Sequence, residues 1–383
     1  MKENDPVLLA EMLIRCQSVT PAEGGAIQLL ERLLRQAGFV CTRIEREGIS
    51  NLYARFGTTG PVFGFNGHTD VVPIGDESAW THPPFSGTID DGVLWGRGAT
   101  DMKSGVAAFV SAAIAATQSG IPGSIAIMIT GDEEGPAKHG TLAILDWMRE
   151  NGEQIDHCLV GEPTSLEQFG DMIKVGRRGS INVTLVAKGS QGHVAYPHRA
   201  KNPITALVEL LHRLTTHKLD DGTEYFDPST LALTTFDVDN PTTNVIPPEA
   251  RARFNIRFND SHSGASLSNW IRGLVAIVSA ETGVAFEMNA NISGESFLTK
   301  SGEFTNLLVE VLRAETGATP ELSTSGGTSD ARFMATHCPV VELGLTGLTM
   351  HQINERVPVE EIRRLRKVYL EILQRYFLST PAT

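Results

Sequence analysis

The sequence of 383 residues contains only four cysteines, and no two of them form a CxxC pair. Cys16, Cys41, Cys158 and Cys338 lie far apart along the chain, and the last two fall in apolar runs that are typical of buried strands. This spacing argues against a thiolate metal site and against a CxxC redox motif. We therefore expect reduced core thiols in a cytoplasmic protein.

Basic residues and long apolar runs are also scarce. The chain has 32 Lys and Arg against 45 Asp and Glu, which gives a formal net charge of −13. This charge argues against nucleic acid or an anionic membrane as the main partner. It still allows a small anionic substrate, because local arginines decide such binding. No run reaches the length of about 18 apolar residues that a membrane-spanning helix needs, so we expect no membrane span.

The order of apolar runs predicts the fold class. Short apolar runs that end in glycine or in polar turns alternate with helical patterns, and this alternation is typical of an α/β sheet with helices on both faces. The chain is also longer than one ordinary domain of about 100–200 residues. We predict strands at 61–67, 124–130, 157–161 and 339–344, and helices at 22–37, 104–118, 140–150 and 359–377.

The middle of the chain has a different pattern. Strands that alternate apolar and polar residues are separated by two helical stretches, in the order β-α-β-β-α-β of a ferredoxin-like unit. We therefore predict a mixed-sheet α/β catalytic domain that is interrupted by a small α+β domain. The predicted boundaries are 1–178 for the first part of the catalytic domain, 179–292 for the inserted domain and 293–383 for the second part.

Carboxylates and a histidine follow three of the predicted strands. His68 and Asp70 come after the first strand, Glu133 and Glu134 after the second, and Glu162 after the third. Open α/β sheets hold their ligands at the carboxyl ends of the strands, so these side chains are expected to share one edge. Oxygen and nitrogen ligands without thiolates suit zinc, cobalt or manganese.

Two further residues belong to the candidate site. Asp101 stands just before a predicted helix, and His351 lies late in the chain. An aspartate in that position is also a common helix cap, and a single histidine before a turn is more often solvated than a ligand. The spacing alone therefore leaves a metal site and a solvated edge both open.

Five motifs together resemble the dinuclear zinc peptidase and deacylase family, which includes aminoacylases, glutamate carboxypeptidases and acetylornithine deacetylases. The resemblance runs in the expected order from about residue 5 to residue 377. The motifs are GHTDVVP (67–73), GRGATDMKSG (96–105), DEEGPA (132–137), VGEP (160–163) and MHQINE (350–355).

The resemblance implies a role for each site residue. Asp101 would bridge two Zn²⁺ ions, with Co²⁺ plausible in one or both positions. His68 and Glu162 would bind one ion, and Glu134 and His351 the other. Glu133 would serve as general base for a metal-bridging hydroxide. Asp70 would orient the imidazole of His68.

Further motifs are RRGS (177–180), KGSQGHVAYPH (188–198), NVIPP (244–248) and SGGTSDARF (325–333). They resemble those of the family members that cleave the amide of N-succinyl-L,L-2,6-diaminopimelate in lysine and diaminopimelate biosynthesis. In those members an anionic substrate is held by arginines, whose planar fork suits carboxylates. The resemblance also implies a homodimer that forms through the inserted domain, which acts as a dimerisation and lid domain. His193 would stabilise the oxyanion across the dimer. The implied substrate-binding residues are Arg178, Asn244, Arg257, Ser325, Gly326, Gly327 and Thr328.

Two alternative functions remain. The first is a related deacylase, such as an acetylornithine deacetylase, or a dipeptidase. Arginines near the site favour the succinyl substrate, because an acetyl group needs no counter-charge. The second is a zinc-binding module without catalysis. Glu133 argues against this second alternative, because structural metal binding does not require it.

Overall fold

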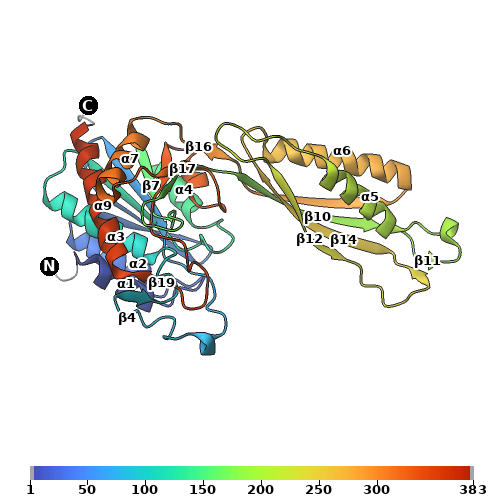
Figure 1. Ribbon diagram of the computed structural model, residues 1–383, viewed down its shortest axis with the longest axis horizontal. Coiled ribbons are helices and arrows are strands. Elements are labelled where there is room, and N and C mark those ends of the chain that lie inside the picture. Colours follow the sequence, from blue (N-terminus) through green and yellow to red (C-terminus); the bar gives the residue numbers. More distant parts are fainter. Residues whose placement is uncertain (1–3, 380–383) are drawn as a thin grey trace. The chain divides into compact units, whose positions relative to one another are not determined.

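The computed structural model describes residues 4–379. The chain forms two compact units (Figure 1). The first runs up to Gly176, resumes over Leu298–Ser323 and continues from Ser329 onward. The second comprises Arg177–Phe297 together with the short segment Thr324–Thr328. No helix within the described residues is long and apolar enough to cross a membrane.

The first unit is built around an eight-stranded mixed sheet with the order β1-β2-β6-β3-β7-β18-β8-β17. β1 and β2 form an antiparallel hairpin at one edge, and β6, β3, β7 and β18 run parallel to one another in the centre. The strands are β1 (Val40–Arg46), β2 (Ile49–Phe56), β3 (Val62–His68), β6 (Ser124–Thr130), β7 (His157–Val160), β8 (Met172–Lys174), β17 (Glu321–Ser323) and β18 (Val340–Glu342).

Helices cover both faces of this sheet, as the sequence predicts. α1 (Pro6–Arg15), α2 (Ala26–Gln36), α3 (Lys103–Gln118), α7 (Glu303–Thr316) and α9 (Val359–Ser379) share one apolar core with Leu52 and Ala54 of β2. Tyr53 lies between these two residues in the strand and therefore points to the other face. There it packs on Trp147 of α4 (Thr141–Asn151), with ring centroids 4.9 Å apart.

Smaller elements shape the loops around this sheet. β4 (Thr88–Asp90), β5 (Val93–Trp95) and β19 (Arg356–Pro358) form a three-stranded sheet that brings the late motif MHQINE beside the GRGATD motif. α8 (Ala331–Met334) precedes β18. The predicted central strands and the long helices of this unit are thus present, which confirms the α/β class.

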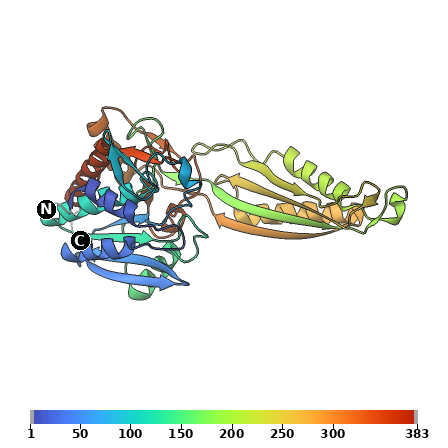
Figure 2. The same cartoon turned by 90° about the horizontal axis from the view of Figure 1, so that it is seen from below.

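The second unit is an antiparallel four-stranded sheet with two helices on one face (Figures 1 and 2). The sheet order β12-β14-β10-β15 is that of a ferredoxin-like unit. The alternation of β14 points Phe254, Ile256 and Phe258 toward the helices. The elements are β10 (Gly179–Lys188), α5 (Pro203–Thr216), β12 (Thr230–Asp237), β14 (Glu249–Phe258), α6 (Gly264–Thr282) and β15 (Ala285–Gly294).

Four two-residue strands complete the fold. β11 (Gly192–His193) pairs with β13 (Val245–Ile246) within the second unit. β9 (Gly176–Arg177) and β16 (Phe297–Leu298) form a two-stranded ladder.

Candidate metal centre

The first half of the site lies at the carboxyl end of β3. His68 is its last residue and is 1% exposed. Its Nε2 atom lies 3.1 Å from Oδ1 of Asp101 and 3.7 Å from Oε1 of Glu162. Asp101 stands just before α3, and Glu162 follows β7. Adjacent parallel strands therefore deliver the imidazole and one carboxylate to a common edge, as the pattern of strand ends predicts.

The second half of the site lies on the other oxygen of Asp101. His351 places Nε2 3.3 Å from Oδ2 of Asp101 and 3.0 Å from Oε1 of Glu134. Glu134 follows β6 and is almost fully buried, whereas the His351 side chain is 49% exposed. The backbone of His351 has φ 61°. This left-handed conformation is uncommon for histidine and is found more often at functional sites.

The electrostatics of the cluster follow from burial and close charges. Burial lowers the pKa of His68, but its hydrogen bond to Asp101 and the charge of Glu162 outweigh burial and hold that pKa well above its usual value. Hydrogen bonds that the His351 imidazole donates to the carboxylates of Asp101 and Glu134 raise the pKa of His351 to about 10. Burial raises the pKa of Glu162 well above its usual value, and the charge of Asp101 adds to this effect.

Glu133 lies beside this cluster and is partly buried. It offers a carboxylate oxygen within 4.8 Å of the ligand atoms of His68 and Glu162. Burial raises the pKa of Glu133 well above its usual value, the charge of His68 opposes the shift, and the charge of Asp330 adds to it. The adjacent glutamates 133 and 134 thus both reach the site, although Glu134 alone contacts His351.

Asp70 lies against the imidazole of His68. The oxygen nearest to Nδ1 of His68 is the backbone carbonyl of Asp70, at 2.9 Å, whereas its carboxylate Oδ1 is 3.7 Å away. The carboxylate accepts hydrogen bonds from the backbone N–H groups of Glu133 (3.2 Å) and Glu134 (3.0 Å) and from the hydroxyl of Thr20 (2.6 Å). Asp70 therefore contacts both the imidazole and the loop that carries the two glutamates.

Sequence reasoning missed the residues that support Asp101. Glu355 accepts a hydrogen bond from the backbone N–H of Asp101 and forms an ion pair with Arg97 at 2.8 Å. Both partners are fully buried. Arg97 lies in the motif GRGATD and Glu355 in the motif MHQINE. The signal for their pairing was therefore one basic residue in the first motif and one acidic residue in the second. Their 258-residue separation hid the pairing.

The remaining predicted site residues lie on the second unit. His193 is exposed, and its Nδ1 accepts a hydrogen bond from the N–H of Ala195. Arg178 donates to the carbonyl of Pro228 at 3.4 Å, and Asn244 accepts a bond from Val194 through its carbonyl. Arg257 lies on β14 with Ser325, Gly326, Gly327 and Thr328 in the same unit. Whether these residues join the metal centre stays a prediction.

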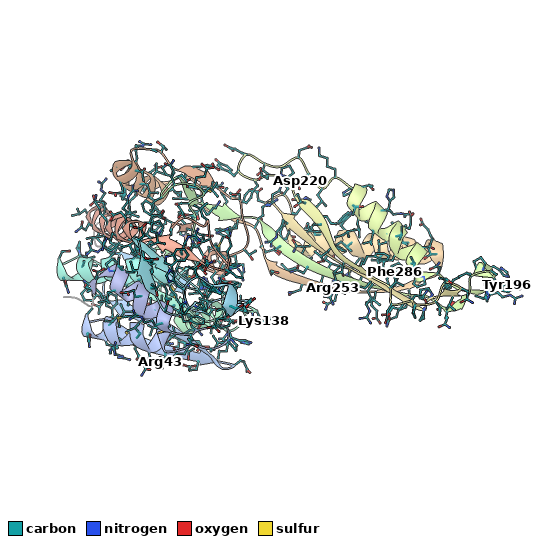
Figure 3. All side chains as sticks on the ribbon, turned by 60° about the horizontal axis from the view of Figure 1, so that its bottom comes forward. Arg43, Lys138, Tyr196, Asp220, Arg253 and Phe286 are labelled. Atoms are coloured by element: carbon teal, nitrogen blue, oxygen red, sulfur yellow. The ribbon has the colours of Figure 1, made fainter. Side chains whose placement is uncertain are left out.

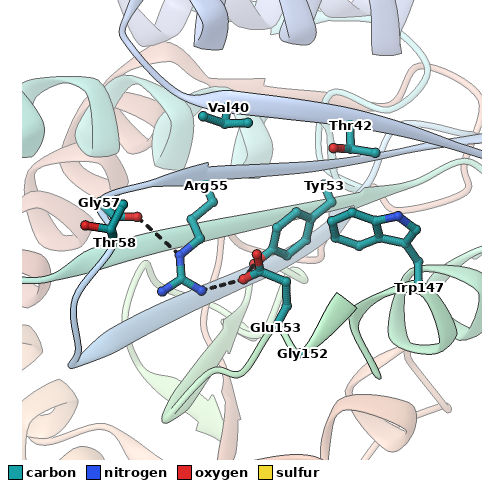
Figure 4. A pocket seen from close by; sticks show the side chains of 9 residues that line it. All are labelled: Val40, Thr42, Tyr53, Arg55, Gly57, Thr58, Trp147, Gly152 and Glu153. Carbon is teal, nitrogen blue, oxygen red and sulfur yellow. Dashed lines mark hydrogen bonds and ion pairs between the residues drawn. The ribbon is translucent and has the colours of Figure 1, made fainter. Parts of the chain in front are cut away.

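A separate pocket of about 420 Å³ lies on the first unit and contains none of these site residues (Figure 4). Tyr53 and Trp147 form one wall, and Glu153 accepts hydrogen bonds from Tyr53 (2.8 Å) and Arg55 (2.5 Å). Tyr53, Arg55 and Glu153 thus form one hydrogen-bonded group in this pocket.

The donor set fits divalent metal ions. The ligand atoms of His68, Asp101 and Glu134 lie within 4.8 Å of one another, as do those of His68, Glu133 and Glu162. Carboxylate oxygens and imidazole nitrogens without thiolates suit Zn²⁺, Co²⁺ or Mn²⁺. Carboxylates outnumber imidazoles in this cluster, so a bound cation would offset their repulsion.

Comparison with known proteins agrees with this geometry. The model of "Peptidase family M20/M25/M40" matches residues 64–375. The chain is similar to a succinyl-diaminopimelate desuccinylase of Cereibacter sphaeroides, with 61% identity over 97% of this chain and 99% of the relative. A succinyl-diaminopimelate desuccinylase of Paracoccus denitrificans is 59% identical over 97% and 98% of the two chains. The fold is similar to that of aminopeptidase PepT from Bacillus cereus, with a TM-score of 0.80 and 20% identity over 97% and 98%.

Proposed function

The chain belongs to peptidase family M20/M25/M40, and on this premise we propose that it is a succinyl-diaminopimelate desuccinylase of lysine and diaminopimelate biosynthesis. The observation that carries the proposal is the identity of about 60% with desuccinylases over nearly the full length of both chains. Water cleaves the amide of N-succinyl-L,L-2,6-diaminopimelate, and the products are succinate and L,L-2,6-diaminopimelate.

The proposed cofactors are two Zn²⁺ ions per subunit, which Co²⁺ can replace. Asp101 would bridge them through its two oxygens, which face His68 and His351 respectively. Glu162 would complete one ligand set and Glu134 the other. Two ions at such a site lower the pKa of water and polarise a carbonyl.

Glu133 is the proposed general base. It takes a proton from the attacking water as the new C–O bond forms, and it returns that proton to the amine nitrogen as the C–N bond breaks. Burial raises the pKa of the Glu133 carboxyl well above its usual value, which supports this role because a carboxylate with a raised pKa is a stronger base. Asp70 supports Glu133 through the loop amides that it binds.

The second unit would recognise the small anionic substrate. Arg178 and Arg257 suit its carboxylates, with hydrogen bonds from Asn244 and from the 325–328 segment. We also propose that residues 179–292 act as a dimerisation and lid domain, so that His193 completes the site of the partner subunit in a homodimer. The four free cysteines support a reducing, cytoplasmic compartment.

The proposal is tested by measuring succinate release from N-succinyl-L,L-diaminopimelate by zinc-loaded protein. N-acetylornithine and a dipeptide serve as parallel substrates, and the Glu133→Gln variant supplies the background. Turnover of the succinyl substrate alone is the expected result. Turnover of only the acetyl substrate or the dipeptide would overturn the substrate assignment and leave the metal centre standing. No turnover of any substrate by protein with two bound metals would favour a binding module.

A further inference from the structure

Asp220 is the centre of a hydrogen-bond network in the second unit, on the loop between α5 and β12 (Figure 3). Its Oδ1 accepts bonds from the N–H of Gly222 (2.8 Å), the N–H of Ser229 (3.1 Å) and the side-chain amide of Asn259 (2.7 Å). Its Oδ2 lies 3.1 Å from Nε2 of His262. One carboxylate thus closes residues 220–229 into a compact loop and ties it to the end of β14.

The strength of this network is visible in its electrostatics. Burial alone would raise the pKa of Asp220, but hydrogen bonds from Ser229, Gly222 and Asn259 outweigh burial and lower that pKa to about 2. Several N–H donors on one carboxylate favour its charged form. Asn259 is itself fully buried and also accepts a bond from Ser261. The 220–229 loop is therefore anchored on the rigid sheet.

The 220–229 loop in turn contacts two segments that we assign to substrate binding. The hydroxyl of Thr324 donates to the carbonyl of Tyr225 at 2.6 Å, immediately before the 325–328 segment. The guanidinium of Arg178 donates to the carbonyl of Pro228 at 3.4 Å. Phe226, between these two residues in the sequence, is buried, with 4% of its surface exposed.

The 325–328 segment is also held by a second contact. Arg177 donates through Nη1 to the carbonyl of Gly327 at 3.2 Å. Gly326 has φ +101°, and a Cβ there would lie 2.6 Å from Nη1 of Arg177. Only glycine adopts this backbone readily and leaves room for the guanidinium. The segment is therefore fixed by Arg177 and, through Thr324, by the 220–229 loop.

From these contacts we infer that Asp220 is a positioning residue for substrate recognition. It holds the 220–229 loop in the conformation that places Arg178 and the 325–328 segment for the carboxylates of the substrate. The inference rests on the proposed function for the identity of the substrate. The contacts themselves do not depend on the identity of the substrate. The role of Asp220 can therefore be tested both with the substrate and without it.

The first measurement is steady-state kinetics of Asp220→Asn with the matched control Asp221→Asn. Asp221 is the next residue, its side chain is 84% exposed, and its partner is the surface residue Lys218. Loss of charge-assisted hydrogen bonds at Asp220 is expected to raise KM for the succinyl substrate about tenfold with kcat within about twofold, because binding is affected more than chemistry. The control is expected to match the wild type.

The second measurement separates positioning from general folding. Thr324→Val removes only the bond to Tyr225 and keeps the shape of the side chain, so it is expected to raise KM as well. If both substitutions act through the same loop contact, the double variant should raise KM by less than the product of the two single increases. Hydrogen exchange, which needs no substrate, should speed up in 220–229 and 324–328 of Asp220→Asn and stay unchanged in Asp221→Asn.

The outcomes distinguish the two proposals. If the wild-type protein does not cleave the succinyl substrate, the proposed function is overturned. The hydrogen-exchange data then test only whether Asp220 holds residues 324–328 in place. Unchanged KM in a folded Asp220→Asn variant of an active enzyme overturns the role of Asp220. A rise in KM with an equally large fall in kcat, together with faster hydrogen exchange throughout the protein, would also overturn the role of Asp220. Such a result would indicate that Asp220 contributes only to stability.

Discussion

The Oε1 atom of Glu355 accepts a hydrogen bond from the backbone N–H of Asp101 at 3.1 Å. The same carboxylate accepts the N–H groups of Gly98 and Thr100, at 3.0 and 2.9 Å, and pairs with the guanidinium of Arg97. One buried side chain thus fixes the whole loop that ends in the proposed bridging ligand. Groups behind the metal ligands commonly control metal affinity in this way.

Replacing Glu355 by glutamine should weaken both stability and metal binding. The change leaves the buried Arg97 without its counter-charge, which typically costs about 3–5 kcal/mol of unfolding free energy. Zinc affinity should fall roughly 10–100-fold, because Asp101 is less well held. Urea unfolding and competitive zinc titration measure the two effects. Glu360→Gln, at an exposed position of α9, is the control, and equal behaviour of the two variants would contradict the role of Glu355.

Replacing Glu133 by glutamine should separate metal binding from catalysis. The proposed ligands remain, so the variant is expected to bind two metal ions. Loss of a general base typically lowers turnover by about 10²–10⁴-fold. Metal analysis and the succinate assay check both parts. Glu150→Gln, on the exposed side of α4, should leave turnover unchanged. Near-normal turnover of Glu133→Gln would remove Glu133 from the mechanism.

Metal binding should release protons and grow tighter as pH rises. In the metal-free protein, the hydrogen bonds that His351 donates to the carboxylates of Asp101 and Glu134 raise the pKa of His351 to about 10, so this imidazole carries a proton at neutral pH. A metal needs the neutral imidazole, and the proton must therefore leave when the ion binds. Because the pKa is raised, the competing proton is lost only as pH approaches about 10. Calorimetric zinc titrations between about pH 6 and 8, in buffers of different ionisation enthalpy, measure the release. Titrations without proton release, or an affinity that is flat with pH, would contradict this account.

A methyl group at Gly344 should disturb Glu162, which we propose as a metal ligand. A Cβ at position 344 would lie 2.2 Å from the backbone oxygen of Glu162, and backbone atoms yield little. Gly344→Ala should therefore lower zinc affinity and destabilise the fold by about 1–3 kcal/mol. At Gly273, in α6, a Cβ meets nothing within 4 Å. Gly273→Ala should instead stabilise the protein by roughly 0.5–1 kcal/mol. Thermal unfolding and zinc titration compare the two variants, and identical results would refute the steric argument.

Much of the catalytic unit could be predicted from the sequence because its signals are local. The apolar runs before His68, Glu134 and Glu162 are short, end in polar turns and alternate with helices. Parallel strands bring their carboxyl ends to one edge, so the three residues had to converge. The alternation of apolar and polar residues likewise predicted strands in the middle of the chain, and β14 is one of them. These inferences need only the spacing of apolar residues along the chain and the parallel direction of neighbouring strands.

Other features depend on contacts that no local pattern reveals. Arg97 and Glu355 are 258 residues apart in the sequence. Taken alone, each would be predicted to be an ordinary charged residue on the surface. The sequence pattern indicated that Asp70 lies near His68, but not that its carboxylate also accepts hydrogen bonds from the backbone N–H groups of Glu133 and Glu134. The segment 324–328 belongs to the second unit although residues on either side belong to the first. Such relationships are set by tertiary packing, which the sequence does not state locally.

Mixing two inactive variants should restore activity if the partner subunit supplies His193. Protein that carries His193→Ala keeps an intact metal centre, and protein that carries Glu133→Ala keeps an intact histidine. A hybrid dimer then contains one site with both groups. With equal amounts and full exchange, half of the dimers are hybrids and one of their two sites is complete. The mixture is therefore expected to recover about a quarter of wild-type activity per site, because active sites add independently.

Subunit exchange has to be measured in the same sample, for example by energy transfer between labelled chains. Recovery that follows the rate of exchange would show that His193 acts across the interface, because neither variant can regain its missing group in any other way. The exposed side chain of His193 is suited to reaching another chain, since no contact within its own subunit buries it. Full exchange without recovery would place His193 outside the partner's site, and the oxyanion would then need a donor from the same chain.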